Sequence, residues 1–207
     1  YITNMAGYPF GGVIHARDNV TITLTGSHIT NTSNVDALAG GVINAQGNSR
    51  ITLMNSHITN TSVSAVGGVQ LHGGVIYAEG RATISLFNSH IANTSARGSD
   101  LESGVIYAEG NATITLTNSH IKDTSNHGAV QGGVICAGLN WRGIWPRPVS
   151  FAAVTLTNSS ITTTSNSPGN VFGGVIYANS NSAITLIGSH IASTTTNGGT
   201  NVYGGVI

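Results

Sequence analysis

The 207-residue chain has few charged residues and a single cysteine. Seven basic residues balance seven acidic ones, and charged side chains make up 7% of the chain, against about 25% in a typical soluble domain. Such a chain lacks the basic surface with which proteins bind nucleic acid or an anionic membrane. The lone Cys136 excludes a framework of internal disulfides. We therefore expect no nucleic-acid partner and no small disulfide-stapled fold.

Long apolar runs are also missing. No run approaches the ~18 residues of a membrane span, so we expect no membrane insertion by this segment. Hydrophobic residues nevertheless make up 40% of the chain, which argues against disorder. The chain begins at Tyr1 without a signal peptide, so a fragment of a longer rod, or a unit that stacks end to end, is expected.

A repeated unit is abundant instead. Each unit begins with Gly-Gly-Val-Ile or Ser-Gly-Val-Ile, continues with an alternating block such as Thr21–Thr25, and ends with a stretch such as His28-Ile29. Alternation in the middle block predicts a strand with one buried face, and Gly and Asn at the joints allow sharp corners. The first strings lie at 11–14, 40–43, 73–76, 103–106, 132–135, 173–176 and 204–207.

One such unit cannot bury its own Ile and Leu residues, but stacking like strands ~4.8 Å apart can. The repeat therefore predicts an all-β parallel β-helix, a single solenoid over residues 1–207 with about six to seven three-stranded coils of ~30 residues. Four inner columns are expected, which pass through Ile14, Ile22, Leu24 and Ile29 in the first coil.

The quoted strings resemble a known family. Gly-Gly-Val-Ile-Tyr-Ala followed by Ile-Thr-Leu-Thr-Asn-Ser resembles autotransporter passenger regions, above all the Gly-Gly-Ala-Ile repeats of polymorphic outer membrane proteins. In this chain Val replaces Ala in every copy, and the companion Phe-x-x-Asn motif is present only as Ile-x-x-Thr. The resemblance implies a right-handed β-helix at a microbial cell surface or outside the cell, with an adhesive role.

The repeat is interrupted once, by an inserted loop at 138–152. Loops on rigid scaffolds commonly carry function, and Trp and Arg are frequent in binding hot spots. The loop is therefore the candidate site for a partner or glycan, and folding back to plug a neighbouring groove is the alternative. Its candidate contact residues are Trp141, Arg142, Trp145, Arg147 and Phe151.

Three files of side chains are expected on the surface. A His file begins at His28 and fits a hydrogen-bonded ladder better than a metal site, because one flat column gives no converging ligands. A second outward Thr file is expected from Thr32 onward, and a flat Thr face resembles ice-binding proteins. The first Thr file contains Thr23, Thr52, Thr115, Thr155 and Thr185, with Ser85 between them.

A valine file beginning at Val13 alternates with the inward Ile residues, so we expect it to face outward. With Tyr77, Tyr107 and Tyr177 it would form an apolar strip for association. The alternative is that the variable segments 63–72 and 95–102 cover this strip.

Catalysis finds little support, because the acids are scattered and Glu79 and Glu109 share a column without a visible partner. We expect no enzyme, no cofactor and no metal. The function predicted first is an extracellular adhesive rod whose partner is a host receptor, a glycan or another copy of the chain. The alternatives are a filament subunit, associating end to end or laterally, and an ice-binding protein.

Overall fold

The computed structural model describes residues 2–3, 6–7, 12–35, 39–65, 70–139, 150–167, 170–179, 181–196 and 202–203. Within these ranges the regular structure consists of β-strands and isolated bridges, without a helix. Accordingly, none of the described segments forms a helix that is long and apolar enough to span a membrane. The insertion's residues 140–149 lie outside the described residues.

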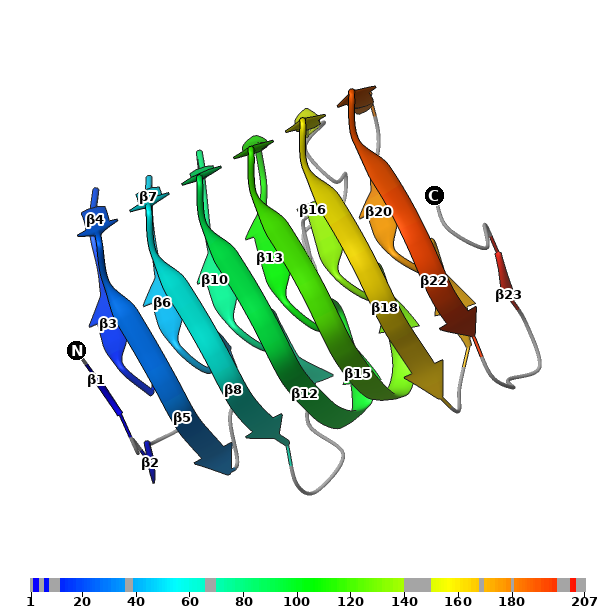
Figure 1. Cartoon of the computed structure of the whole chain (residues 1–207), viewed down its shortest axis with the longest axis horizontal. Helices are drawn as coiled ribbons and strands as arrows, with labels where there is room; N and C mark the ends of the chain where they lie inside the picture. The colour runs from blue at the N-terminus through cyan, green and yellow to red at the C-terminus, as the bar shows by residue number, and fades with distance from the viewer. Residues whose placement is uncertain are drawn as a thin grey trace.

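Three parallel sheets form the sides of a β-solenoid, and successive coils lie side by side along its length (Figure 1). Each unit contributes one strand to each sheet, as the repeat predicts. Sheet I contains β3 (Ile14–Ala16), β6 (Ile43–Ala45), β10 (Ile76–Ala78), β13 (Ile106–Glu109), β16 (Ile135–Leu139) and β20 (Ile176–Ala178). Sheet II contains β4 (Thr21–Thr25), β7 (Arg50–Met54), β11 (Thr83–Phe87), β14 (Ala112–Thr117), β17 (Ala152–Thr157) and β21 (Ala183–Ile187).

Sheet III contains the longest strands. These are β5 (His28–Val35), β8 (His57–Ser64), β12 (His90–Leu101), β15 (His120–Gln131), β18 (Ser160–Ser167) and β22 (His190–Thr196). Short strands pair onto them: β1 (Ile2–Thr3), β2 (Ala6–Gly7), β9 (Gln70–Leu71), β19 (Val171–Phe172) and β23 (Val202–Tyr203). Six coils in register make about five full turns, which confirms the predicted fold.

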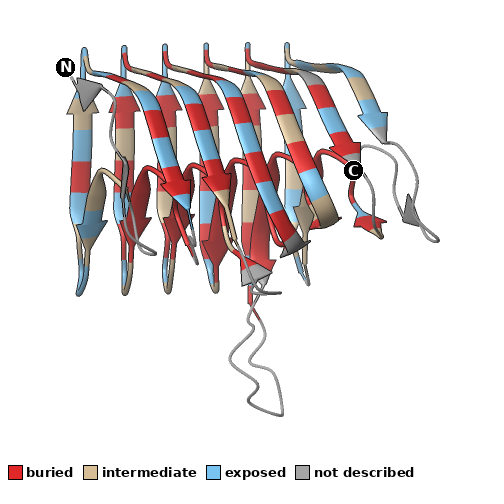
Figure 2. Ribbon diagram, turned by 90° about the horizontal axis from the view of Figure 1, so that it is seen from below, coloured by how far each residue is buried: buried red, intermediate tan, exposed pale blue. Residues whose placement is uncertain are grey.

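The pairing register confirms the predicted inner columns. Ile51 pairs with Ile84 and Leu53 with Leu86, so identical side chains stack from coil to coil. These columns form one continuous core cluster, and bands of buried and exposed residues alternate along the strands (Figure 2). In the last described coil the columns are open: Ile184 is half-buried and Leu186 is 41% exposed. Burial of each central Ile or Leu contributes about 1.5–3 kcal/mol.

The Gly-Gly pair forms the corner that leads into sheet I. Gly73 adopts a φ of 62°, in the left-handed region that glycine enters without steric cost. A Cβ on Gly74 would lie only 2.3 Å from the backbone oxygen of Gly104 in the next coil. The second glycine is thus required because neighbouring coils approach each other closely at this corner.

This corner also reverses the expected direction of the valine file. The amides of Val42 and Ile43 both donate to the carbonyl of Val75, at 3.0 and 2.9 Å. Two successive amides therefore point the same way, and the strand alternation is broken between them. The prediction that the valines face outward was wrong: five of them are fully buried in the main core, namely Val42, Val75, Val105, Val134 and Val175.

A second phase shift lies inside sheet III. Asn31 has a φ of 55°, and the register passes directly from Thr30 to Thr32. The residue after the kink therefore points inward instead of outward. The predicted second outward Thr file is wrong for this reason: Thr32 and its equivalents Thr61, Thr94, Thr124 and Thr164 are buried. The Thr32 hydroxyl donates to the Thr61 hydroxyl at 3.1 Å, so this column is a buried hydroxyl ladder.

The corner between sheets II and III is closed by a serine ladder. The hydroxyl of Ser89 donates to the carbonyl of Phe87 at 2.9 Å and accepts the amide of Ser56 at 3.1 Å. Ser119 repeats this arrangement one coil later. Both serines are fully buried, so the Ser of each Ser-His-Ile string satisfies backbone groups that would otherwise be orphaned at the corner.

Candidate ligand-binding surface

The end of the insertion presents a large exposed aromatic side chain. Phe151 is 59% exposed and directly precedes β17. The hydroxyl of Ser150 donates to the carbonyl of Gly138, which holds the two ends of the insertion together. Phe151 is therefore anchored to a fixed part of the solenoid. The other candidate contact residues of the insertion lie outside the described residues: Trp141, Arg142, Trp145 and Arg147.

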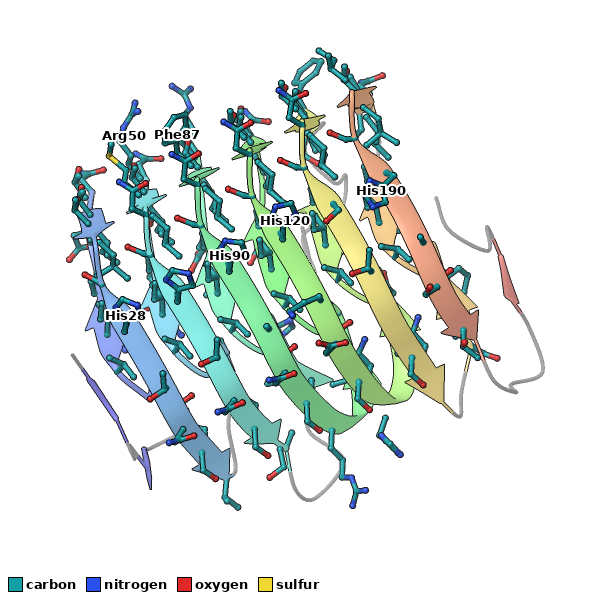
Figure 3. The ribbon with its side chains drawn as sticks, viewed as in Figure 1. His28, Arg50, Phe87, His90, His120 and His190 are labelled. Carbon is teal, nitrogen blue, oxygen red and sulfur yellow. The ribbon has the colours of Figure 1, made fainter. Side chains whose placement is uncertain are left out.

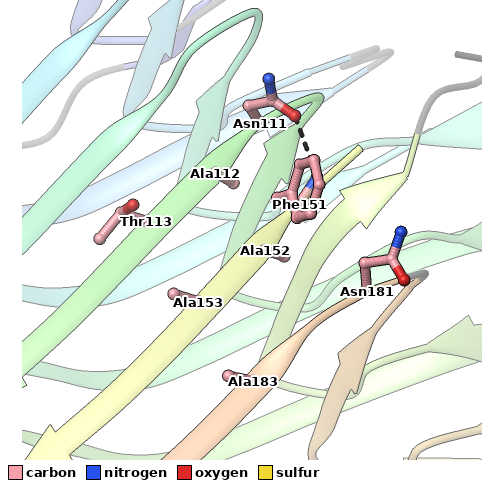
Figure 4. A pocket seen from close by; sticks show the side chains of 8 residues that line it. All are labelled: Asn111, Ala112, Thr113, Phe151, Ala152, Ala153, Asn181 and Ala183. Atoms are coloured by element: carbon pink, nitrogen blue, oxygen red, sulfur yellow. Dashed lines mark hydrogen bonds between the residues drawn. The ribbon is translucent and has the colours of Figure 1, made fainter. Parts of the chain in front are cut away.

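An open groove of about 360 Å³ lies beside Phe151 (Figure 4). The amide of Phe151 donates to the side-chain oxygen of Asn111 at 2.9 Å, so the aromatic residue is tied to the preceding coil. The exposed side chains of Asn111 and Asn181 line the groove. Its lining residues in the described part of the chain are all uncharged: Asn111, Ala112, Thr113, Phe151, Ala152, Ala153, Asn181 and Ala183.

The groove results from a change within one outward column of sheet II. Register pairs Thr113 with Ala153 and Ala153 with Ala183. Earlier coils carry the longer Thr21, Arg50 and Thr83 at the same position of the column. Truncation to alanine in two successive coils hollows the sheet surface next to Phe151.

Chemically, the Phe151 groove offers one aromatic face, two amide side chains and small apolar walls. Amides both donate and accept hydrogen bonds, and an aromatic face covers apolar surface of a ligand. This combination suits a neutral polyhydroxylated ligand. The sequence had identified Phe151 but not the groove, because the groove depends on residues about 30 and 40 positions away.

The first Thr file lies on the outer face of sheet II, as predicted. Thr23 and Thr185 are exposed, and Thr52, Thr115 and Thr155 are half-buried. The neighbouring outward file is irregular, because Met54 and Phe87 interrupt it with 38% and 42% exposed side chains. Arg50 and Phe87 project from this sheet in Figure 3. Ice binding by the Thr file stays a prediction.

The His file forms a stacked ladder on the outer face of sheet III (Figure 3). Ring centroids of His28, His57, His90 and His120 are 4.8, 4.9 and 5.0 Å apart in succession. Nδ1 of His120 lies 2.7 Å from the hydroxyl of Ser160, which ends the ladder. Burial, followed by the neighbouring His57, His120 and Lys122, lowers the pKa of His90. In the described ranges, no three His, Cys, Asp or Glu side chains are grouped to hold a metal ion.

The predicted apolar strip for association is wrong for two of its tyrosines. Tyr107 is fully buried and Tyr77 is 7% exposed, while Tyr177 is half-buried. The rings of Tyr77 and Tyr107 stack at 5.5 Å, and the ring of His72 lies 5.3 Å from that of Tyr107. The cover comes from segments that precede the Gly-Gly corners: Ala39 belongs to one small core with both tyrosines and Cys136, and the ring of His72 lies against both tyrosine rings.

This cover encloses a group of titratable side chains that the sequence did not reveal. Glu102 is fully buried and its carboxylate is hydrogen-bonded to Nδ1 of His72, whose side chain is 24% exposed. Burial and the nearby Glu102 raise the pKa values of the Tyr107 phenol and the Cys136 thiol. Because Glu102, Tyr107 and Cys136 are all fully buried, a substrate does not reach them. His72 contacts Glu102 and the ring of Tyr107, and so links the cover to sheet I.

Glu109, one of the two acids that share a column in the sequence, packs against the same tyrosines. The hydroxyl of Tyr77 donates to Glu109 at 3.0 Å, and Glu109 is 8% exposed. The carboxylate is thus engaged in the packing of sheet I. The sequence places His72 and Glu102 about one coil apart, so their proximity could have been predicted. That both lie beside the buried tyrosines could not, because this depends on how the cover packs on sheet I.

The fold therefore defines the chain as a β-solenoid with parallel coils. Comparisons of the chain with protein-family models, with curated proteins and with solved structures find no match.

Proposed function

We propose that this chain is an extracellular adhesive rod that binds a glycan through the insertion and the groove beside Phe151. The observation that carries the proposal is the 59% exposed Phe151 at the rim of a groove of about 360 Å³ whose described lining residues are uncharged. The interior of the rod is filled by the continuous hydrophobic core, so contact residues are expected on its surface and loops.

Three features of the solenoid support display at a surface. Its outer faces are rich in Thr, Ser and Asn and poor in charge. The coils stack in register, so the insertion is held on a rigid support. The repeat strings resemble those of autotransporter passengers and polymorphic outer membrane proteins, whose Gly-Gly-Ala-Ile strings are similar to Gly73-Gly74-Val75-Ile76. We place the chain at a microbial cell surface on this basis.

The test compares glycan binding by the parent chain, a deletion of residues 139–150, and Phe151→Ala. The probes are immobilised neutral oligosaccharides of hexoses and N-acetylhexosamines, and far-UV circular dichroism checks that each variant folds. Phe87→Ala is the matched control, because Phe87 is a 42% exposed phenylalanine on the same sheet but outside the groove. We expect the deletion and Phe151→Ala to weaken binding and Phe87→Ala to leave it unchanged. Equal binding by folded Phe151→Ala and parent chain would contradict the proposed site.

A further inference from the structure

A second groove lies along the same edge of sheet II, three coils nearer the N-terminus. Its volume is about 300 Å³. The exposed side chains of Arg50 and Arg81 are the charged groups among its described lining residues. The remaining lining residues are uncharged: Asn19, Val20, Thr21, Asn48, Ser49 and Thr83.

The two guanidinium groups are available for a ligand. Within the described ranges, neither the Lys122–Asp123 ion pair nor the His72–Glu102 contact involves Arg50 or Arg81. The backbone amide of Arg81 donates to Asn48 at 3.2 Å, and Asn48 donates to Asn19 at 3.1 Å. These bonds fix the floor of the groove and leave both guanidinium groups free. Two cations in one groove without an acid favour an anionic group, above all a carboxylate or sulfate that arginine binds with two parallel hydrogen bonds.

The arginine groove and the Phe151 groove are consecutive along the rod. Thr21, Arg50 and Thr83 of the first belong to the same outward column as Thr113, Ala153 and Ala183 of the second. Thr83 and Thr113 pair directly, so no coil separates the two grooves. At ~4.8 Å per coil, Arg50 and Ala183 lie about 19 Å apart along the axis. A linear polymer lying along the rod would therefore reach both.

We infer that the ligand is an acidic polysaccharide that runs along the edge of sheet II, with its acidic groups at Arg50 and Arg81 and its uncharged part beside Phe151. The inference rests on the proposed function and specifies its ligand class. Arg50 and Arg81 supply selectivity for charge, and Phe151 with its two asparagines supplies contacts that any glycan can make. Long-range attraction is small for a chain with no net charge, so selectivity depends on these local contacts.

The test measures the affinity of the whole chain for three soluble polymers at physiological ionic strength: hyaluronan, which carries carboxylates; chondroitin sulfate, which also carries sulfates; and uncharged dextran. The variants are the double variant Arg50→Gln/Arg81→Gln and the control Arg97→Gln. Arg97 is exposed on sheet III, away from both grooves, so the control removes a charge without touching the site.

We expect the parent chain to bind both acidic polymers more tightly than dextran. Arg50→Gln/Arg81→Gln should weaken binding of the acidic polymers about tenfold, leave dextran binding unchanged and remove most of the salt dependence. Arg97→Gln should bind all three polymers like the parent chain. Phe151→Ala should weaken all three.

The outcomes separate the two proposals. Equal affinity of the parent chain for dextran and the acidic polymers, or unchanged acidic binding by the folded double variant, overturns the acidic-ligand inference and leaves the glycan-binding proposal standing. Failure of the parent chain to bind any of the three polymers or the neutral oligosaccharides contradicts both.

Discussion

The second glycine of each Gly-Gly-Val-Ile string gives the sharpest test of how the coils stack. In Gly74→Ala the new Cβ would lie 2.3 Å from the Gly104 oxygen and 3.1 Å from the Cβ of Ala96, whereas real Cβ contacts essentially never fall below 3.0 Å. Two rigid backbones must therefore separate, because no flexible side chain can yield.

The magnitude follows from the hydrogen bonds at that corner. Gly74 donates to Ser103 at 3.1 Å, Val75 donates to Val105 at 3.0 Å, and Gly41 donates to Gly74 at 3.2 Å. Weakening three such bonds at about 1 kcal/mol each predicts a loss of about 3 kcal/mol in the free energy of unfolding. For a chain of this size that loss lowers Tm by roughly 6–12 °C.

The matched control is Gly26→Ala. Gly26 has a φ of 57° but open space around a Cβ, so alanine there costs only the left-handed backbone, about 1–2 kcal/mol. Urea denaturation followed by far-UV circular dichroism measures both variants against the parent chain. A Gly74→Ala variant that is as stable as Gly26→Ala would refute the argument that close approach of coils imposes the second glycine.

Two further predictions concern the core and the His ladder. Ile84 is fully buried in a central coil, so Ile84→Ala should lower the free energy of unfolding by about 2–5 kcal/mol. Ile184 is half-buried in the last described coil, so Ile184→Ala should lower it clearly less. Equal losses in urea denaturation would contradict the argument that central coils contribute more to the core than the last described coil. The pKa of His90 is held below its ordinary value of 6.5, so on acidification the unfolded chain protonates this histidine before the folded chain does. The stability that depends on neutral His90 is therefore complete above about pH 6.5 and is lost as the pH falls below that value. Urea denaturation between pH 8 and 5 should therefore show a smaller loss of unfolding free energy on acidification for His90→Gln than for the parent chain. The control His190→Gln lies beyond the end of the ladder and should behave like the parent chain. Identical pH profiles for all three proteins would rule out the ladder as the cause.

The repeat in the sequence was sufficient to predict three parallel sheets, the Ile and Leu columns and the outward Thr23 file. These features depend on local alternation along a strand and on the identity of residues one period apart, and both are visible in the chain itself. The His ladder was predicted for the same reason, since His28 immediately precedes the inward Ile29.

Only the tertiary structure decided what happens where alternation fails. The paired amides of Val42 and Ile43 and the left-handed Asn31 shift the phase by one residue, so valines and threonines that a strict period of two places outside are buried. The asparagine was a visible signal, but its φ angle follows from the packing of the coils.

Long-range cover decided the rest. Tyr107 is buried in a small core with Ala39, Tyr77 and Cys136, and His72 contacts both Tyr107 and the buried Glu102. The grooves beside Arg50 and Phe151 are each formed by residues from three successive coils. A repeat determines which residues share a column, because stacking in register follows from the period. Which columns are covered or hollowed depends on side-chain size and on segments between the repeats, and these act only once the coils have stacked.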